Sequence, residues 1–171
     1  MPHSPEQERI AALQSYDVLD TPAEAEFDAI VRQAAAEFGT PIALVSLIDE
    51  NRQWFKAKVG LGVSETPRSI SFCTHAIEGE DVFVIGNAKQ DSRFADNSLV
   101  TGDPNIRFYA GAPLKTPSGR RIGTLCVIDR EPRTGLSAGQ KATLERLADR
   151  TMQAFERRQR RSDARKGAAA A

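Results

Sequence analysis

The spacing of apolar residues is that of a helix after Thr21. Thr21 can cap a helix, Pro22 suits its first position and Glu24 completes a T-x-x-E capping box. Gly39 and Pro41 then supply stop signals. A helix is therefore predicted between these signals. Its apolar face would consist of Phe27, Ile30, Val31, Ala34 and Phe38.

Two further helices are predicted, one at each end of the chain. A short one is expected around residues 6–15, with Ile10 and Leu13 facing inward. The last begins at Ser137, which forms a second capping box with Gln140. Residues at a/d-like spacing along this last helix are Leu144, Leu147, Thr151, Ala154 and Arg158.

Strand patterns fill most of the middle of the chain. Residues 42–49, "IALVSLID", are apolar on both alternating faces, which is typical of a central strand. Residues 53–59 alternate Trp54 and two lysines against apolar residues, so this strand belongs near an edge. A short strand is expected at 82–86. The segments "IRFYAGAPLKT" and "RIGTLCVID" are joined by "PSGR" as a hairpin.

This order of elements predicts an α+β domain with a mainly antiparallel sheet and flanking helices. Two segments, 60–81 and 87–105, lack clean periodicity. Connections of this length in a compact domain are usually functional. We therefore expect a binding site among them.

Composition narrows the function classes. The 171 residues are 40% hydrophobic and 27% charged, which suits one soluble globular domain. No stretch approaches the roughly 18 apolar residues of a membrane span, and the N-terminus does not resemble a secretory signal. The two cysteines, at 73 and 126, suit a reducing cytoplasm. We expect no membrane partner and a cytoplasmic location.

Charge is unevenly placed although its sum is zero. Residues 156–171 carry a balance of +4, which leaves −4 on the first 155 residues. A nucleic-acid-binding domain would spread basic charge over a folded face. Here the excess lies on a terminal tail, so no nucleic-acid partner is expected.

Five separated blocks of the sequence resemble a known family. They are "YDVLDTPAEAEFDAIV", "PIALVSLIDENRQWFKAKVGL", "ETPRSISFCTHAI", "DSRFADNSLVTGDPNIRFYAGAPL" and "GTLCVIDR". In this order and spacing they are similar to the GAF domains of bacterial sensor histidine kinases and diguanylate cyclases. The resemblance implies a six-stranded antiparallel sheet with the N- and C-terminal helices on one face. It places a ligand pocket on the other face, roofed by the two long segments.

The resemblance divides the chain into a disordered N-terminus (1–5), a sensory domain (6–155) and a basic helix end and tail (156–171). The heptapeptide "SFCTHAI" is expected to form a short helix over the pocket, anchored by Phe72 and Ile77. The residues expected to bind the ligand are Trp54, Arg68, Phe72, Cys73, His75, Phe94, Arg107 and Tyr109. The two arginines could clamp an anion, or could pair with acids such as Glu65 or Asp103.

Two sequence motifs are associated with known GAF ligands, and this sequence matches neither of them well. Bilin attachment usually has a histidine directly after the cysteine, whereas Thr74 separates Cys73 from His75, and the Asp-Ile-Pro block is missing. Cyclic-nucleotide binding goes with an Asn-Lys-x-Phe-x₃-Asp-Glu arrangement. The segment "NAKQDSRFAD" has similar residues at the wrong spacing. The resemblance therefore leaves the ligand and any cofactor unidentified.

An enzyme of the free methionine-(R)-sulfoxide reductase branch is the catalytic alternative. That chemistry needs a low-pKa thiolate and a resolving thiol. Cys73 lies in a comparable segment, but Cys126 does not match the other cysteines of that branch. A metal site is not expected either, because Cys73 and His75 supply only two ligands.

We therefore predict a non-catalytic domain that senses a small molecule and signals through its terminal helices. The alternatives are the reductase using Cys73 and a dimerisation or spacer module without ligand. A homodimer is expected through the terminal helices, where Thr151, Ala154 and Arg158 of the last helix would face a second copy with Phe155 beside them. The output would belong to a separate kinase or cyclase, as in two-component signalling, or to a longer protein that contains this domain.

Overall fold

Six strands form one antiparallel sheet in the computed structural model, which describes residues 4–170. Their order across the sheet is β3-β2-β1-β6-β5-β4. The strands are β1 (Ile42–Ile48), β2 (Arg52–Val59), β3 (Glu65–Pro67), β4 (Phe83–Ile85), β5 (Phe108–Lys115) and β6 (Arg121–Asp129). The α-helices are α1 (Pro5–Ser15), α2 (Ala25–Phe38), α3 (Phe72–Ala76), α4 (Ser98–Thr101) and α5 (Ala138–Ala170).

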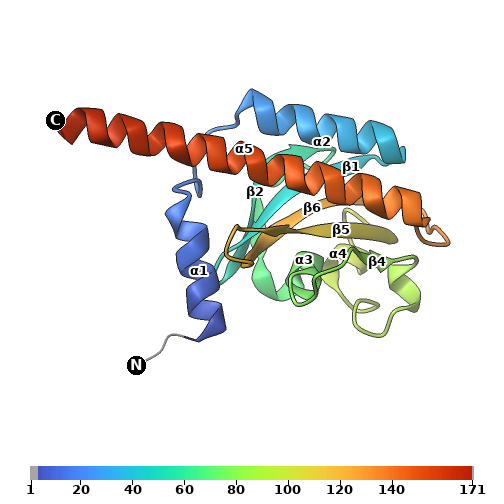
Figure 1. Ribbon diagram of the computed structural model, residues 1–171. Coiled ribbons are helices and arrows are strands. Elements are labelled where there is room, and N and C mark those ends of the chain that lie inside the picture. Colours follow the sequence, from blue (N-terminus) through green and yellow to red (C-terminus); the bar gives the residue numbers. More distant parts are fainter. Residues whose placement is uncertain (1–3, 171) are drawn as a thin grey trace.

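The two faces of the sheet are covered differently (Figure 1). Helices α2 and α5 cross one face, and the inward side of α1 joins them through Leu13. Short α3 and α4, with their connecting segments, cover the other face. The predicted α+β fold, with terminal helices on one face of a six-stranded sheet, is confirmed. None of the helices described in residues 4–170 is long and apolar enough to cross a bilayer.

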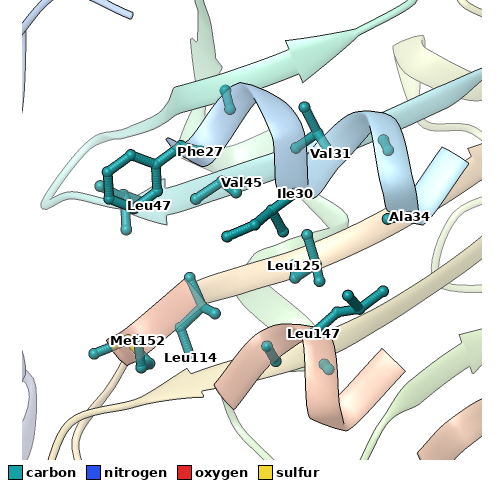
Figure 2. Close-up of a cluster of buried hydrophobic side chains, with 14 of the residues drawn as sticks. Phe27, Ile30, Val31, Ala34, Val45, Leu47, Leu114, Leu125, Leu147 and Met152 are labelled. Atoms are coloured by element: carbon teal, nitrogen blue, oxygen red, sulfur yellow. The ribbon is translucent and has the colours of Figure 1, made fainter. Parts of the chain in front are cut away.

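Buried side chains form one cluster on each face, because alternate residues of a strand point to opposite sides. The cluster under α2 and α5 is called here the helix-side core, and Figure 2 shows its central part. The cluster under α3 and α4 is called the roof-side core. In β1, Val45 and Leu47 belong to the former, and Leu44 and Ile48 to the latter. The prediction that this strand is covered on both faces is confirmed.

A β-bulge changes which way the residues of β2 face. Val45 pairs with Ala57 and the next residue of β1 pairs with Phe55, so Lys56 is the extra residue. Trp54 packs in the helix-side core and Phe55 in the roof-side core. The predicted face of Trp54, Lys56 and Lys58 is therefore wrong, because the bulge interrupts the alternation.

The start of α2 also differs from its prediction. The helix begins after Glu24, which occupies the cap position without a side-chain capping bond. The Glu24 carboxylate pairs instead with Lys56 and Arg158. The Thr21 hydroxyl accepts a hydrogen bond of 2.9 Å from Lys56 Nζ. The predicted capping box is wrong, because the side chains of Thr21 and Glu24 both contact the buried Lys56 instead.

The two ends of the chain are more closely packed than predicted. Ser4 caps α1 through a capping box with Gln7, although disorder was expected for residues 1–5. Residues 1–3 lie outside the described part. In α5, Thr151, Ala154 and Phe155 are all buried within this chain. The prediction that they face a second copy is wrong, because they pack on α2 and the sheet. Dimerisation through the exposed sides of the terminal helices stays a prediction.

Candidate functional site

A cavity of about 330 Å³ lies between the sheet and the roof segments. It extends from β1, β2 and β3 to α3 and the ends of β5 and β6. Most of its lining is apolar: Ile42, Leu44, Phe55, Leu61, Val63, Ile70, Phe72, Leu99, Pro104, Ile106 and Ile128. Among the described residues, the charged groups of the lining are Glu65 and Asp103. The space is therefore suited to a ligand that is largely apolar and carries no negative charge.

One polar patch of the cavity wall is centred on Gln53 at the start of β2. The Oε1 atom of Gln53 accepts hydrogen bonds from the hydroxyls of Ser46, at 2.8 Å, and Ser71, at 3.0 Å. Its amide nitrogen donates to Thr66 Oγ1 at 3.0 Å. All four residues are buried. These bonds fix the orientation of Gln53, so that its position in the cavity is defined before any ligand arrives.

A second polar patch surrounds Cys73 on α3. The hydroxyls of Tyr109 and Thr124 each donate a hydrogen bond to Cys73 Sγ at 3.1 Å. The free thiol of Cys126 is a further neighbour of this sulfur atom. Burial alone would raise the pKa of Cys73, but these hydrogen bonds lower it below its usual value. Burial and the neighbouring sulfur raise the pKa of Cys126. Of the two thiols, Cys73 is therefore the one that loses its proton more readily.

The position of Tyr109 depends on a glycine in the same strand. A Cβ atom at Gly111 would lie 2.3 Å from the Tyr109 hydroxyl oxygen. The tyrosine ring therefore folds over Gly111 to reach Cys73, and any side chain at that position would displace it. Gly111 also pairs with Cys126 on β6. One glycine thus allows the contact between tyrosine and thiol on this face of the sheet.

Five of the eight predicted site residues come together on the roof side. Phe72, Cys73 and Tyr109 line the cavity. Phe94 is buried behind Phe72, with ring centroids 4.1 Å apart. His75 contacts the edge of Phe94, with centroids 4.9 Å apart, and faces an outer groove instead of the cavity. As expected, "SFCTHAI" contains a short roof helix, α3.

The three other predicted site residues lie elsewhere. Arg68 donates to two backbone carbonyls of the 49–50 turn and pairs with Glu6. Arg107 donates to the carbonyls of residues 100 and 106. Trp54 lies on the opposite face of the sheet. Arg68, Arg107 and Trp54 do not line the roof-side cavity. The arginines are long enough to reach carbonyls of nearby loops, and the bulge decides the direction of Trp54.

Several residues of the wall were not predicted. Ser46, Gln53, Thr66, Thr124 and Cys126 form or support the two polar patches. A signal for two of them was present, because Ser46 and Thr124 interrupt otherwise apolar strands. Such interruptions in a buried strand demand hydrogen-bonding partners. Within residues 4–170, no group of three His, Cys, Asp or Glu side chains could hold a metal ion.

The sequence matches a known family and a longer relative. The family model described as GAF domain matches residues 22–155. A cyclic di-GMP phosphodiesterase of Pseudomonas aeruginosa is 48% identical over 149 residues. This match covers 86% of the present chain and 25% of the relative. The chain thus spans about a quarter of the length of the curated relative it matches.

Solved structures share the fold. The GAF domain of an Acinetobacter phosphoenolpyruvate-protein phosphotransferase has a TM-score of 0.65 at 18% identity, covering 91% of this chain and 95% of that one. A free methionine-R-sulfoxide reductase of Neisseria meningitidis, solved with its substrate, has a TM-score of 0.64 at 17% identity. This match covers 95% of both chains. At such identities the likeness extends to the fold alone.

Proposed function

The chain belongs to the GAF domain family, and from this premise we propose that it is a non-catalytic domain that senses a small molecule. The observation that carries this proposal is the cavity of about 330 Å³ on the roof side. Ligand sites are typically largely apolar clefts with a few placed polar groups, and volumes of about 300–1,000 Å³ are usual. The cavity fits the lower end of this range.

The cavity wall supports a particular class of ligand. Glu65 and Asp103 are acidic, and both arginines once expected to clamp an anion are bonded elsewhere. An anion would therefore meet like charge without a cation to balance it. Gln53 and Thr66 supply hydrogen-bonding atoms inside an apolar enclosure. The ligand we propose is neutral or cationic, with an apolar body and one polar group directed at this pair.

A route for the signal is part of the proposal. Phe55 of β2 lines the cavity, and the next residue, Lys56, points to the opposite face of the sheet. There Lys56 pairs with Glu24, which in turn binds Arg158 of α5. A ligand that shifts the bulge of β2 would therefore also shift the carboxylate that holds α5. This two-step chain of ion pairs gives the helix a physical connection to the ligand.

The output is proposed to belong to another domain or protein. The relative in Pseudomonas aeruginosa is named a phosphodiesterase and is far longer than this chain. This supports a sensory domain that regulates a signalling enzyme such as a phosphodiesterase, kinase or cyclase. A homodimer remains part of the proposal. So does a cytoplasmic location, since both cysteines are buried free thiols.

Native mass spectrometry of the purified full chain tests the ligand. We expect a bound small molecule whose occupancy falls in Thr66→Val, which removes a cavity hydroxyl with little change in shape. Thr151→Val is the matched control, because Thr151 is also a buried threonine but lies on α5, which covers the opposite face of the sheet. A protein that retains no ligand and is not stabilised by any member of a metabolite library would favour the spacer module.

The contact between two cysteines favours a second candidate, the sulfoxide reductase. Cys73 lines the cavity and the free thiol of Cys126 is its neighbour, which supplies the two thiols that this chemistry needs. Turnover of free methionine (R)-sulfoxide with a dithiol reductant, abolished in Cys73→Ser, would establish the enzyme. Absence of turnover in the reduced wild-type protein would leave the sensor.

A further inference from the structure

A second cavity, of about 320 Å³, lies outside the roof-side site. It is bounded by the start of α1, the end of α3 and the turn between β5 and β6. Four arginines line it: Arg9, Arg68, Arg120 and Arg121. The acids of the lining are Glu6 and Glu78. Segments far apart in the sequence thus bring four guanidinium groups to one small space.

Arg9 has an unsatisfied donor at this cavity. Its side chain is only 9% exposed. Its Nε atom bonds to Glu6 at 2.9 Å and its Nη1 atom to the carbonyl of Ile48 at 2.7 Å. The Nη2 atom is buried and has no partner in the part of the chain that the structure describes. A buried charged donor without an acceptor is costly, so an acceptor at this point would be strongly favoured.

The Glu6 carboxylate shows that an oxyanion is stable here. It bridges Arg9, at 2.9 Å, and Arg68, at 3.1 Å. Burial alone would raise the pKa of Glu6, but the two arginines lower it below its usual value. The local potential is therefore positive enough to keep an acid ionised.

Arg120 and Arg121 pair only weakly with acids, although Arg121 Nε also donates to the carbonyl of Ile77 at 2.5 Å. Arg120 pairs with Glu8, and both side chains are more than one third exposed. The contact of Arg121 with the exposed Glu80 is 3.7 Å long. Exposed ion pairs of this kind contribute little to stability. A stronger anion could replace either acid at small cost.

We propose that this arginine cavity binds a phosphate group, either as free phosphate or as part of a small phosphate ester. The planar fork of arginine matches phosphate oxygens in pairs, and the lining carries four such forks beside two carboxylates. Its oxygens would bind Arg120 and Arg121, and the guanidinium groups of Arg9 and Arg68 behind them would add positive potential. The bound group would tie α1 to the end of the roof helix α3 and to the β5–β6 turn.

Calorimetric titration of the full chain at constant ionic strength tests this site, with inorganic phosphate and glycerol 3-phosphate as probes. Binding of both identifies phosphate alone as sufficient, and binding of the ester alone identifies an organic phosphate as the ligand. Arg120→Gln should weaken binding about tenfold, as expected for the loss of one charged hydrogen bond. Glu6→Gln should tighten it, because it removes the competing carboxylate.

Arg130→Gln is the matched control, because Arg130 is exposed just beyond the opposite end of β6. It should bind like the wild-type protein. These variants alter exposed or partly exposed side chains, so folding is not expected to limit the test. The proposal is overturned if neither probe binds, or if Arg120→Gln and Arg130→Gln bind alike.

Discussion

The two faces of the sheet differ in how completely they are filled. On the helix side, α2 and α5 cover the strands with a continuous apolar cluster (Figure 2). On the roof side, the same strands carry Ser46, Thr124, Cys126 and Tyr109 beside a cavity. Long helices bury an apolar stripe efficiently, whereas short segments leave gaps and polar groups. The difference indicates that one face provides stability and the other provides a site.

The largest expected effect lies on the helix side. Phe155 is fully buried and packs against Phe27, with ring centroids 4.6 Å apart. Phe155→Ala should lower the free energy of unfolding by about 3–5 kcal/mol, the usual cost of such a cavity. Denaturant unfolding measures it. Phe83→Ala, on the partly exposed roof edge, is the comparison and should cost clearly less. Equal losses of unfolding free energy in the two variants would contradict the conclusion that the helix-side face provides most of the stability.

The next effect concerns the ion pairs that connect the faces. Lys56 has a side-chain exposure of 0%, and Glu24 is 34% exposed. Removing one partner of a fully buried pair costs about 3–5 kcal/mol. Because Glu24 is partly solvated, we expect Glu24→Gln to cost about 2 kcal/mol. Lys56→Met should cost less, since it removes the buried charge itself. Unfolding curves in which Lys56→Met is the more damaging change would contradict this account.

A smaller effect is expected in acid. Burial alone would raise the pKa of Glu24, but hydrogen bonds from Lys56 and Arg158 lower it below its usual value of 4.5. Below that pH the unfolded chain binds more protons than the folded chain. The stabilisation is therefore complete above pH 4.5 and is lost as the pH falls through the folded-state pKa. Urea unfolding at a series of acidic pH values should show this loss, and Glu24→Gln should reduce it.

Much of the fold could be predicted because periodicity reports burial directly. Helices α1, α2 and α5 and strands β1, β2, β4, β5 and β6 follow from it, and their arrangement from the family resemblance. The bulge at Lys56 could not be predicted, because polar and apolar residues alternate in the sequence on both sides of it without interruption. Strand β3 has only three residues and shows no period. The apolar row of α5 around Phe155 was assigned to a dimer interface, because helical spacing alone does not identify the surface that covers such a row. Here Phe27 and Tyr16 cover Phe155.

The site could be predicted only in part. Phe72, Cys73 and Tyr109 were expected in the pocket and do line it. Arg68 and Arg107 were not distinguishable from ligand-binding residues, because both donate to backbone carbonyls that any sequence provides, and Glu6, the further partner of Arg68, is distant in the sequence. A hydrogen bond between two side chains requires a particular residue type at the partner position, which the sequence displays. A hydrogen bond to a backbone carbonyl requires no particular residue there, so the sequence gives no sign of it.

The most direct test of the account makes the same substitution on both faces of one strand. Leu44 lines the cavity and Leu47 lies in the helix-side core, and both are buried in β1. Leu47→Phe should overpack its core and cost about 1–3 kcal/mol. Leu44→Phe should instead fill empty space, cost within about 1 kcal/mol and abolish ligand retention.

Each variant is to be measured by urea unfolding and by native mass spectrometry. The account predicts that Leu47→Phe is destabilised but keeps its ligand, while Leu44→Phe stays stable and loses it. If Leu44→Phe is as destabilised as Leu47→Phe, or retains the ligand at wild-type occupancy, the roof-side cavity is not the binding site.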